Sequence, residues 1–233
     1  MMAQFKGSDA TQLVVSHVRR MLDGGELRAG DRLPSERDLA RQLGVSRPSL
    51  RAGLRSLAVM GVLRIRPGAG SFIAGGPPAF GSDTFGFQAA LHRFTLDQMF
   101  QARLVLEVAV ASLAAEHASS DDMIAASEEA TGMFASLDDP HAFLRHDIAF
   151  HKAVAAASGN PILSALVNMV SEEFRAQRQP TISRAQDLKE AADEHRAIYL
   201  ALRAHDPDRA GRAMRDHLER AYRTQAGEES VGA

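Results

Sequence analysis

Residues 33–74 read LPSERDLARQLGVSRPSLRAGLRSLAVMGVLRIRPGAGSFIA, and this stretch decides the fold of the N-terminal part. Ser35 followed by Asp38 is a weak capping box that predicts the start of a short helix, and Gly44 is typical of the end of one. Ser46 then caps a second helix. Two helices joined by a turn of about three residues have the spacing of a helix-turn-helix.

The residues after the second helix predict a β-hairpin, or wing. Residues 62–66 alternate apolar and polar side chains, residues 67–70 (PGAG) indicate a turn, and residues 71–74 continue as a second strand. Gly68 and Gly70 allow the tip of this hairpin to approach the backbone of a partner closely.

Arginines are the residues of this part that we expect to meet a partner. With the apolar positions in the core, Arg37, Arg47 and Arg51 are left facing outward. Arg47 and Arg51 lie four residues apart at the start of the second helix and share one face. The first residues of a recognition helix read base edges, and arginine suits guanine. Arginines that only solvate a surface are the alternative, but helix spacing, wing and positive charge coincide here.

Charge is unevenly divided along the chain. Residues 1–74 hold 12 Lys and Arg against 6 Asp and Glu, whereas the remaining residues hold 15 against 23. A basic module joined to an acidic one is typical of a protein that meets a polyanion through one part only. The chain has no cysteine, which excludes disulfides and thiolate zinc sites. Without a signal-peptide layout or an apolar run of membrane-spanning length, we expect a cytoplasmic protein with no membrane partner.

Residues after the hairpin predict a linker and then helices only. The linker is rich in Gly and Pro and has no periodicity. Three later helices begin at an Asx cap followed by proline: Asp139-Pro140, Asn160-Pro161 and Asp206-Pro207. We therefore predict a mainly α fold, a winged helix-turn-helix followed by an antiparallel all-helical bundle. The expected boundaries are residues 1–74 for the first domain, 75–88 for the linker, 89–226 for the bundle and 227–233 for a tail.

Four residues of the helical part have the spacing of a metal site. Asp147 and His151 lie four residues apart on one predicted helix and share a face. His195 and His217 are equally far from the Asp206-Pro207 turn, so they lie at the same height in an antiparallel hairpin. One carboxylate and three imidazoles suit Zn²⁺ or a similar divalent ion and leave positions open for a further ligand. A merely structural role for the same four residues remains the alternative.

A fifth residue is expected at the same cavity. Asn168 lies about as far from the Gly159-Asn160 turn as His151 does, on the other side of it.

An open site of this kind also occurs in metalloenzymes, where the metal activates water. No motif fixes any glutamate as a general base here, so we expect a binding protein and no enzyme.

The N-terminal stretch resembles the DNA-binding domain of the GntR family of bacterial regulators, over about residues 10–74. The resemblance implies DNA contacts by Arg37, Arg47, Arg51 and the wing-tip Gly68. The family's recognition helix usually continues Arg-Glu-Ala, whereas this chain has Arg51-Ala52-Gly53. We expect Gly53 to cost the helix about 1 kcal/mol, and the missing acidic residue to alter the orientation of Arg51.

The helical part is similar to the FCD effector domain of the FadR-type branch, over about residues 90–225. The similar segments are RLVLE (103–107), DIAFH (147–151) with the following AAASGNP, EHRAI (194–198) and MRDH (214–217). The resemblance implies a divalent metal, Zn²⁺ with Ni²⁺ or Mn²⁺ as alternatives, on Asp147, His151, His195 and His217. It also implies that Arg103 meets the carboxylate of a small organic acid effector, with Asn168 at the same cavity. A homodimeric repressor on a palindromic operator in double-stranded DNA is the function expected.

Overall fold

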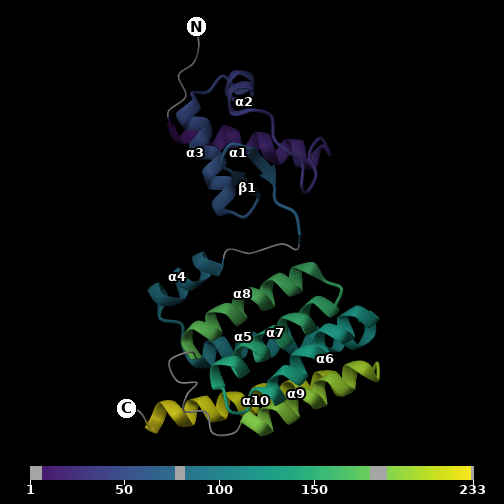
Figure 1. Cartoon of the computed structure of the whole chain (residues 1–233). Coiled ribbons are helices and arrows are strands. Elements are labelled where there is room, and N and C mark those ends of the chain that lie inside the picture. Colours follow the sequence, from purple (N-terminus) through teal and green to yellow (C-terminus); the bar gives the residue numbers. More distant parts are fainter. Residues whose placement is uncertain (1–6, 77–81, 179–187, 232–233) are drawn as a thin grey trace. The chain divides into compact units, whose positions relative to one another are not determined.

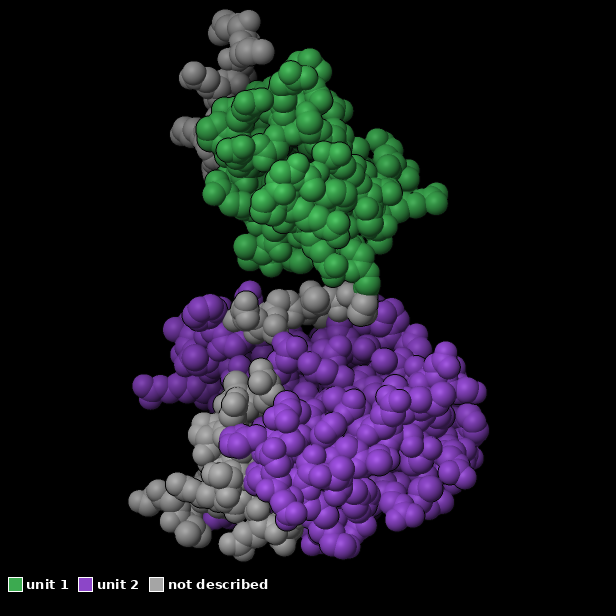
Figure 2. Space-filling model, viewed as in Figure 1, with its two compact units in different colours: residues 1–81 green, residues 82–233 purple. Residues whose placement is uncertain are grey.

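The computed structural model describes the backbone of residues 7–76, 82–178 and 188–231. The chain forms two compact units, residues 1–81 and residues 82–233 (Figure 1, Figure 2). The first unit, green in Figure 2, holds both described strands. The second unit is helical over the elements that the structure describes, so the mainly α fold is confirmed.

The first unit has the predicted helix-turn-helix and wing. Its elements are α1 (Gly7–Asp23), α2 (Glu36–Leu43), α3 (Arg47–Val59), β1 (Leu63–Arg66) and β2 (Gly70–Ile73). Ser35 and Ser46 cap α2 and α3, each accepting a hydrogen bond from the backbone N–H three residues on, at 3.2 Å. Gly44 ends α2 with φ of 65°, in the left-handed region that favours glycine. The strands pair antiparallel, with Leu63 opposite Ile73.

Gly53 lies where α3 packs against α1. A Cβ added at this position would lie 2.6 Å from the Cβ of Val14, closer than real Cβ atoms approach. Val14 is fully buried in the core of the first unit, together with Leu50 and Leu54 of α3. The glycine therefore permits the close approach of two helices, which explains a residue that helix propensity alone marks as unfavourable.

The second unit is a bundle of helices. Its elements are α4 (Ser82–His92), α5 (Leu96–His117), α6 (Ser120–Ala135), α7 (Pro140–Ala157), α8 (Pro161–Arg178), α9 (Leu188–Arg203) and α10 (Pro207–Val231). Helix α5 contacts α7, α8, α9 and α10 (Figure 1). The pairs α6–α7 and α9–α10 are joined by short turns and pack side by side, so the helices of each pair run antiparallel. Ala111, Ala114 and Ala115 are fully buried on α5, where their small side chains admit its neighbours closely.

The three Asx-Pro pairs begin helices as predicted. In each pair the Asx side-chain oxygen accepts a hydrogen bond from the backbone N–H three residues on: Asp139 from Ala142 at 3.0 Å, Asn160 from Leu163 at 3.2 Å, and Asp206 from Arg209 at 2.9 Å. These caps set where α7, α8 and α10 begin, and hence the height of every side chain along them.

Two segments differ from the sequence-based expectation. Helix α4 occupies the second half of the expected linker, whose residues 77–81 lie outside the described residues. Apolar side chains occur all round α4, so no helical periodicity reveals it, and contact with α8 holds it in place. Helix α10 continues to Val231, through most of the residues expected to form a tail.

Among the described helices, α5 alone is long and apolar enough to cross a membrane, by length and composition only. The expectation that no segment has this character is therefore wrong for α5. The helix carries a buried ion pair, Arg103 with Glu107, and packs against four other helices. Both features are those of the central helix of a bundle.

Candidate functional site

The four predicted ligand residues converge inside the second unit. One donor atom of each lies within 4.8 Å of the others, although the residues come from α7, α9 and α10. All four side chains are buried: Asp147, His151, His195 and His217. The i, i+4 spacing on α7 and the symmetry about the Asp206-Pro207 turn therefore bring these residues together as the sequence predicts.

The donor atoms face one another across short distances. His195 Nε2 lies 3.0 Å from Asp147 Oδ1 and 3.3 Å from His151 Nε2. The ring centroids of His195 and His217 are 4.1 Å apart, and each of these rings is 5.3 Å from that of His151. Three imidazoles and a carboxylate in a buried cluster are the donor set of a divalent metal site.

Hydrogen bonds on the outer side of two rings fix which nitrogen faces the cluster. His195 Nδ1 donates to the backbone carbonyl of Ala191 at 2.7 Å, which leaves Nε2 free of a proton in the neutral ring. His217 Nδ1 pairs with Glu194 Oε2 at 3.0 Å, and Glu194 also accepts a hydrogen bond from Arg220. Such outer partners orient metal-binding histidines and raise their basicity.

A buried ion pair on α5 supports the third ring. Glu107 Oε2 lies 2.5 Å from His151 Nδ1, although the two are not aligned for a hydrogen bond. Glu107 Oε1 accepts a hydrogen bond from Arg103 Nε at 2.6 Å. The Arg103 guanidinium lies over the Phe174 ring, 4.1 Å from its centroid. The i, i+4 spacing of Arg103 and Glu107 is also common in ion pairs on helix surfaces, but the structure buries both side chains.

The electrostatics of the cluster favour the forms that bind metal. Burial alone would raise the pKa of Glu107, but the Arg103 charge and the contact with His151 outweigh it and lower the pKa to about 2. Burial is the main cause that lowers the pKa of His217 well below its usual 6.5, and the neighbouring His195 and His151 lower it further. The neutral imidazole is the form that ligates a metal, so the residues present fit a divalent ion.

Helix α8 presents polar atoms that have no partner among the described residues. Asn168 Oδ1 and Ser171 Oγ are both buried there without a hydrogen bond. Asn168 is predicted from its height in the hairpin, while Ser171, three residues further along α8, was not singled out by the sequence. Because buried polar atoms are normally satisfied, these two indicate a place where a water or a ligand group binds.

The arginines predicted to contact DNA lie on the surface of the first unit. The Arg37 side chain is 75% exposed, and Arg47 and Arg51 are also exposed at the start of α3. Arg51 Nε lies 2.7 Å from Glu36 Oε2, so this arginine is ion-paired with a glutamate of α2. At the wing tip, Gly68 has φ of 73°, a conformation that favours glycine.

Comparison with known proteins decides the family. Residues 10–73 match the model of bacterial regulatory proteins of the gntR family, and residues 98–220 match the FCD domain. The HTH-type transcriptional repressor NanR of Edwardsiella tarda (strain FL6-60) is 33% identical over 226 residues, 91% of this chain and 84% of that protein. NanR of Escherichia coli (strain K12) is 32% identical over 223 residues, 89% and 81% of the two chains. The chain belongs to the GntR family and carries an FCD domain.

Structural comparison agrees with this assignment. The solved structure of a Streptococcus agalactiae GntR has a TM-score of 0.70 at 27% identity, covering 92% of this GntR-family chain and 99% of that one. The family consists of bacterial regulators, so the prediction of a regulator in preference to a metalloenzyme is confirmed. The ligand set and the DNA-contacting residues stay predictions.

Proposed function

We propose that this GntR-family protein is a transcriptional repressor whose affinity for operator DNA is controlled by a small carboxylate effector bound at a divalent metal. The NanR relatives are named as repressors, and this supports the sign of regulation. The proposal includes a cytoplasmic homodimer that binds a palindromic operator, because a twofold protein places two recognition helices on two half-sites.

The buried histidine and aspartate cluster is the observation that supports the proposed divalent metal. Four ligand atoms lie within 4.8 Å of one another, and two glutamates and one backbone carbonyl contact the far sides of the three rings. Three imidazoles and one carboxylate favour Zn²⁺, with Ni²⁺ or Mn²⁺ as alternatives, and leave coordination positions for an effector. The proposed ligands are Asp147, His151, His195 and His217.

The effector part rests on Arg103 and Asn168. Arg103 uses Nε to hold Glu107, and its guanidinium has four further N–H donors. A carboxylate bound to those donors while also ligating the metal would connect Arg103 with the cluster. Asn168 would add a hydrogen bond through its unpartnered Oδ1. These contacts favour a hydroxy, keto, dicarboxylic or sugar acid.

The DNA part rests on the exposed arginines of the first unit. Arg47 and Arg51 begin the recognition helix α3, Arg37 lies on α2, and Gly68 turns the wing tip. We propose that these four residues contact the operator and that the segment after residue 74 connects this domain with the effector domain, which includes α4 and extends through α10. The effector must bind the DNA-competent and the released arrangements with different affinity for regulation to occur.

A thermal-shift screen of organic acids tests the proposed effector control. Zn²⁺-loaded protein and protein stripped with a chelator are compared over hydroxy, keto, dicarboxylic and sugar acids. At least one class is expected to raise the melting temperature of the loaded protein only, because a ligand stabilises the state it binds. That acid should then release the protein from a DNA site selected from random sequence, as read by fluorescence anisotropy.

Matched histidine variants control this screen. His151→Ala removes a proposed ligand, whereas His141→Ala removes an exposed histidine near the start of the same helix. The effector response should be lost in His151→Ala and kept in His141→Ala. Equal responses of both variants, or an acid that acts on stripped protein, would contradict control through the metal.

A further inference from the structure

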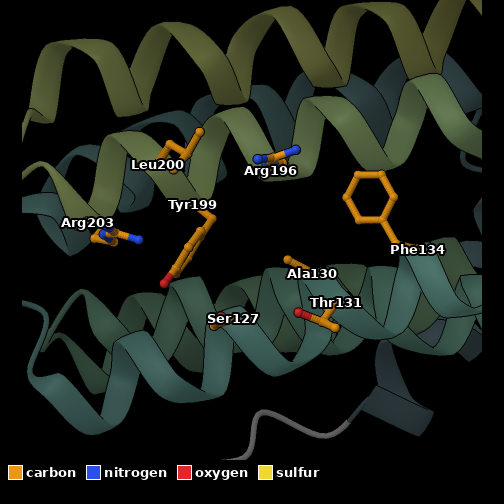
Figure 3. A pocket seen from close by; sticks show the side chains of 8 residues that line it. All are labelled: Ser127, Ala130, Thr131, Phe134, Arg196, Tyr199, Leu200 and Arg203. Atoms are coloured by element: carbon orange, nitrogen blue, oxygen red, sulfur yellow. The ribbon is translucent and has the colours of Figure 1, made fainter.

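A cavity opens between α6 and α9, on a different side of α9 from the histidine cluster. Its volume is about 300 Å³, and it contains none of the four proposed metal ligands (Figure 3). His195 and Arg196 are neighbours on α9, but the first is fully buried in the bundle and the second is exposed beside the cavity. The lining residues are Ser127, Ala130, Thr131, Phe134, Arg196, Tyr199, Leu200 and Arg203.

Two arginines give the cavity its charge. Arg196 and Arg203 are seven residues apart, two turns along α9, and therefore lie on one face. Neither forms an ion pair or hydrogen bond with a residue that the structure describes, and no acidic residue lines the cavity. The chain after residue 74 carries 15 basic residues against 23 acidic ones, so this local positive charge opposes the charge of its surroundings.

Hydroxyl groups and apolar surface complete the lining. Tyr199 lies between the two arginines along α9, and Figure 3 shows its hydroxyl directed toward α6. Ser127 and Thr131 are four residues apart on α6 and offer two further hydroxyls from the opposite wall. Phe134 and Leu200 supply apolar surface, and Leu200 is 38% exposed.

We propose that this cavity binds a small amphipathic organic anion, with its charged head on Arg196 or Arg203 and its apolar body against Phe134 and Leu200. Guanidinium groups recognise carboxylates, sulfonates and phosphates through paired N–H donors, while an apolar wall selects against inorganic ions. A cavity of about 300 Å³ lies at the small end of ligand sites, which limits the body to one or two rings. The site is independent of the proposed metal centre.

Titration with 5-dimethylaminonaphthalene-1-sulfonate, a fluorescent anion whose body is two fused rings, tests this proposal on the full-length protein. The double variant Arg196→Gln/Arg203→Gln is expected to weaken binding by about tenfold or more, because both charge-assisted contacts are lost. Arg209→Gln/Arg212→Gln, which removes the same charge from exposed positions of α10, should change the affinity less than about twofold, since distant exposed charges are screened. Ser127→Trp fills the cavity and should abolish binding with both arginines present. Each comparison is repeated in His151→Ala protein, where the α6–α9 binding should persist.

Three outcomes would overturn the proposal. The first is equal affinity of the wild-type protein and Arg196→Gln/Arg203→Gln for the probe. The second is a loss of affinity in the α10 double variant as large as that in the α9 double variant. Alternatively, Ser127→Trp would convert the protein from dimer to monomer in sedimentation without changing probe affinity, which would make the groove a subunit interface. Circular dichroism of each variant identifies loss of affinity by unfolding, and Tyr199→Phe provides a milder second variant that should weaken binding without loss of fold.

Discussion

At the residue scale, the histidine rings are held from behind by groups that are not themselves ligands. Glu194 pairs with His217 and Arg220, Glu107 contacts His151, and the Ala191 carbonyl accepts from His195. Each partner occupies Nδ1, so the three rings turn Nε2 toward a common point. A ligand cluster held in this way loses little conformational freedom when a metal binds.

Glu194→Ala should therefore weaken metal binding without removing a ligand. Loss of an outer partner of this kind lowers metal affinity by about 10- to 100-fold. A competition titration against a chelating dye measures the effect. Glu129→Ala is the matched control, because Glu129 pairs with His146, a histidine outside the cluster, at 2.8 Å. Unchanged affinity in Glu194→Ala, or an equal loss in Glu129→Ala, would show that Glu194 has no positioning role.

Arg47→Ala should weaken DNA binding at the recognition helix. An arginine that reads a base edge contributes about 1–3 kcal/mol of discrimination between bases, so both affinity and sequence preference should fall. Fluorescence anisotropy with the selected operator and a scrambled duplex separates the two effects. Arg41→Ala serves as control, since Arg41 is exposed on α2 and paired with Asp38 at 2.9 Å. If Arg47→Ala keeps the sequence preference of the wild-type protein, other residues recognise the bases.

Gly53→Ala should destabilise the first unit, although alanine is the better helix former. The added Cβ meets Val14 at 2.6 Å, and overpacking of this kind costs about 1–3 kcal/mol, more than the roughly 1 kcal/mol gained in propensity. Denaturant unfolding measures the change. The double variant Gly53→Ala/Val14→Ala should lose less stability than the sum of the two single variants, because the smaller side chain at position 14 leaves room for the new Cβ. A Gly53→Ala protein as stable as the wild type would mean that α1 can move away from α3 at little cost in free energy.

At the element scale, the antiparallel α9–α10 hairpin explains why the ligand set is predictable. Two residues equally far from a tight turn lie at one height, and the cap at Asp206 fixes where that turn ends. The outer partners are less predictable because they depend on how helices distant in sequence cross. Glu107 reaches His151 only through the packing of α5 on α7, and the role of Gly53 depends on the distance between α1 and α3. Helix α4 lacks any periodicity to reveal it.

Asp206→Ala should test the contribution of this turn. Removal of an Asx cap costs about 0.5–2 kcal/mol of helix or protein stability, so the unfolding free energy of the protein should fall by that amount. Asp208→Ala, an exposed position in the first turn of α10, should lower it less, because it removes only an interaction with the helix dipole. Equal losses in the two variants would show that the Asp206 hydrogen bond contributes nothing of its own.

At the scale of the whole molecule, a basic unit with exposed arginines is joined in one chain to an acidic helical unit with a buried ligand cluster. Regulation in this account is a difference in effector affinity between two arrangements of the protein. Both the effector contacts and the coupling to DNA depend on the ion proposed at the centre of the cluster, so regulation requires the metal.

Elemental analysis of purified protein by mass spectrometry tests whether the cluster binds a divalent metal. After incubation with Zn²⁺ and removal of free metal, the wild-type protein and His141→Ala should retain about one ion per chain, the occupancy of a single site. His151→Ala and His217→Ala should retain almost none. Wild-type protein that retains no divalent metal, or the same metal content in all four proteins, would contradict metal binding by the histidine cluster.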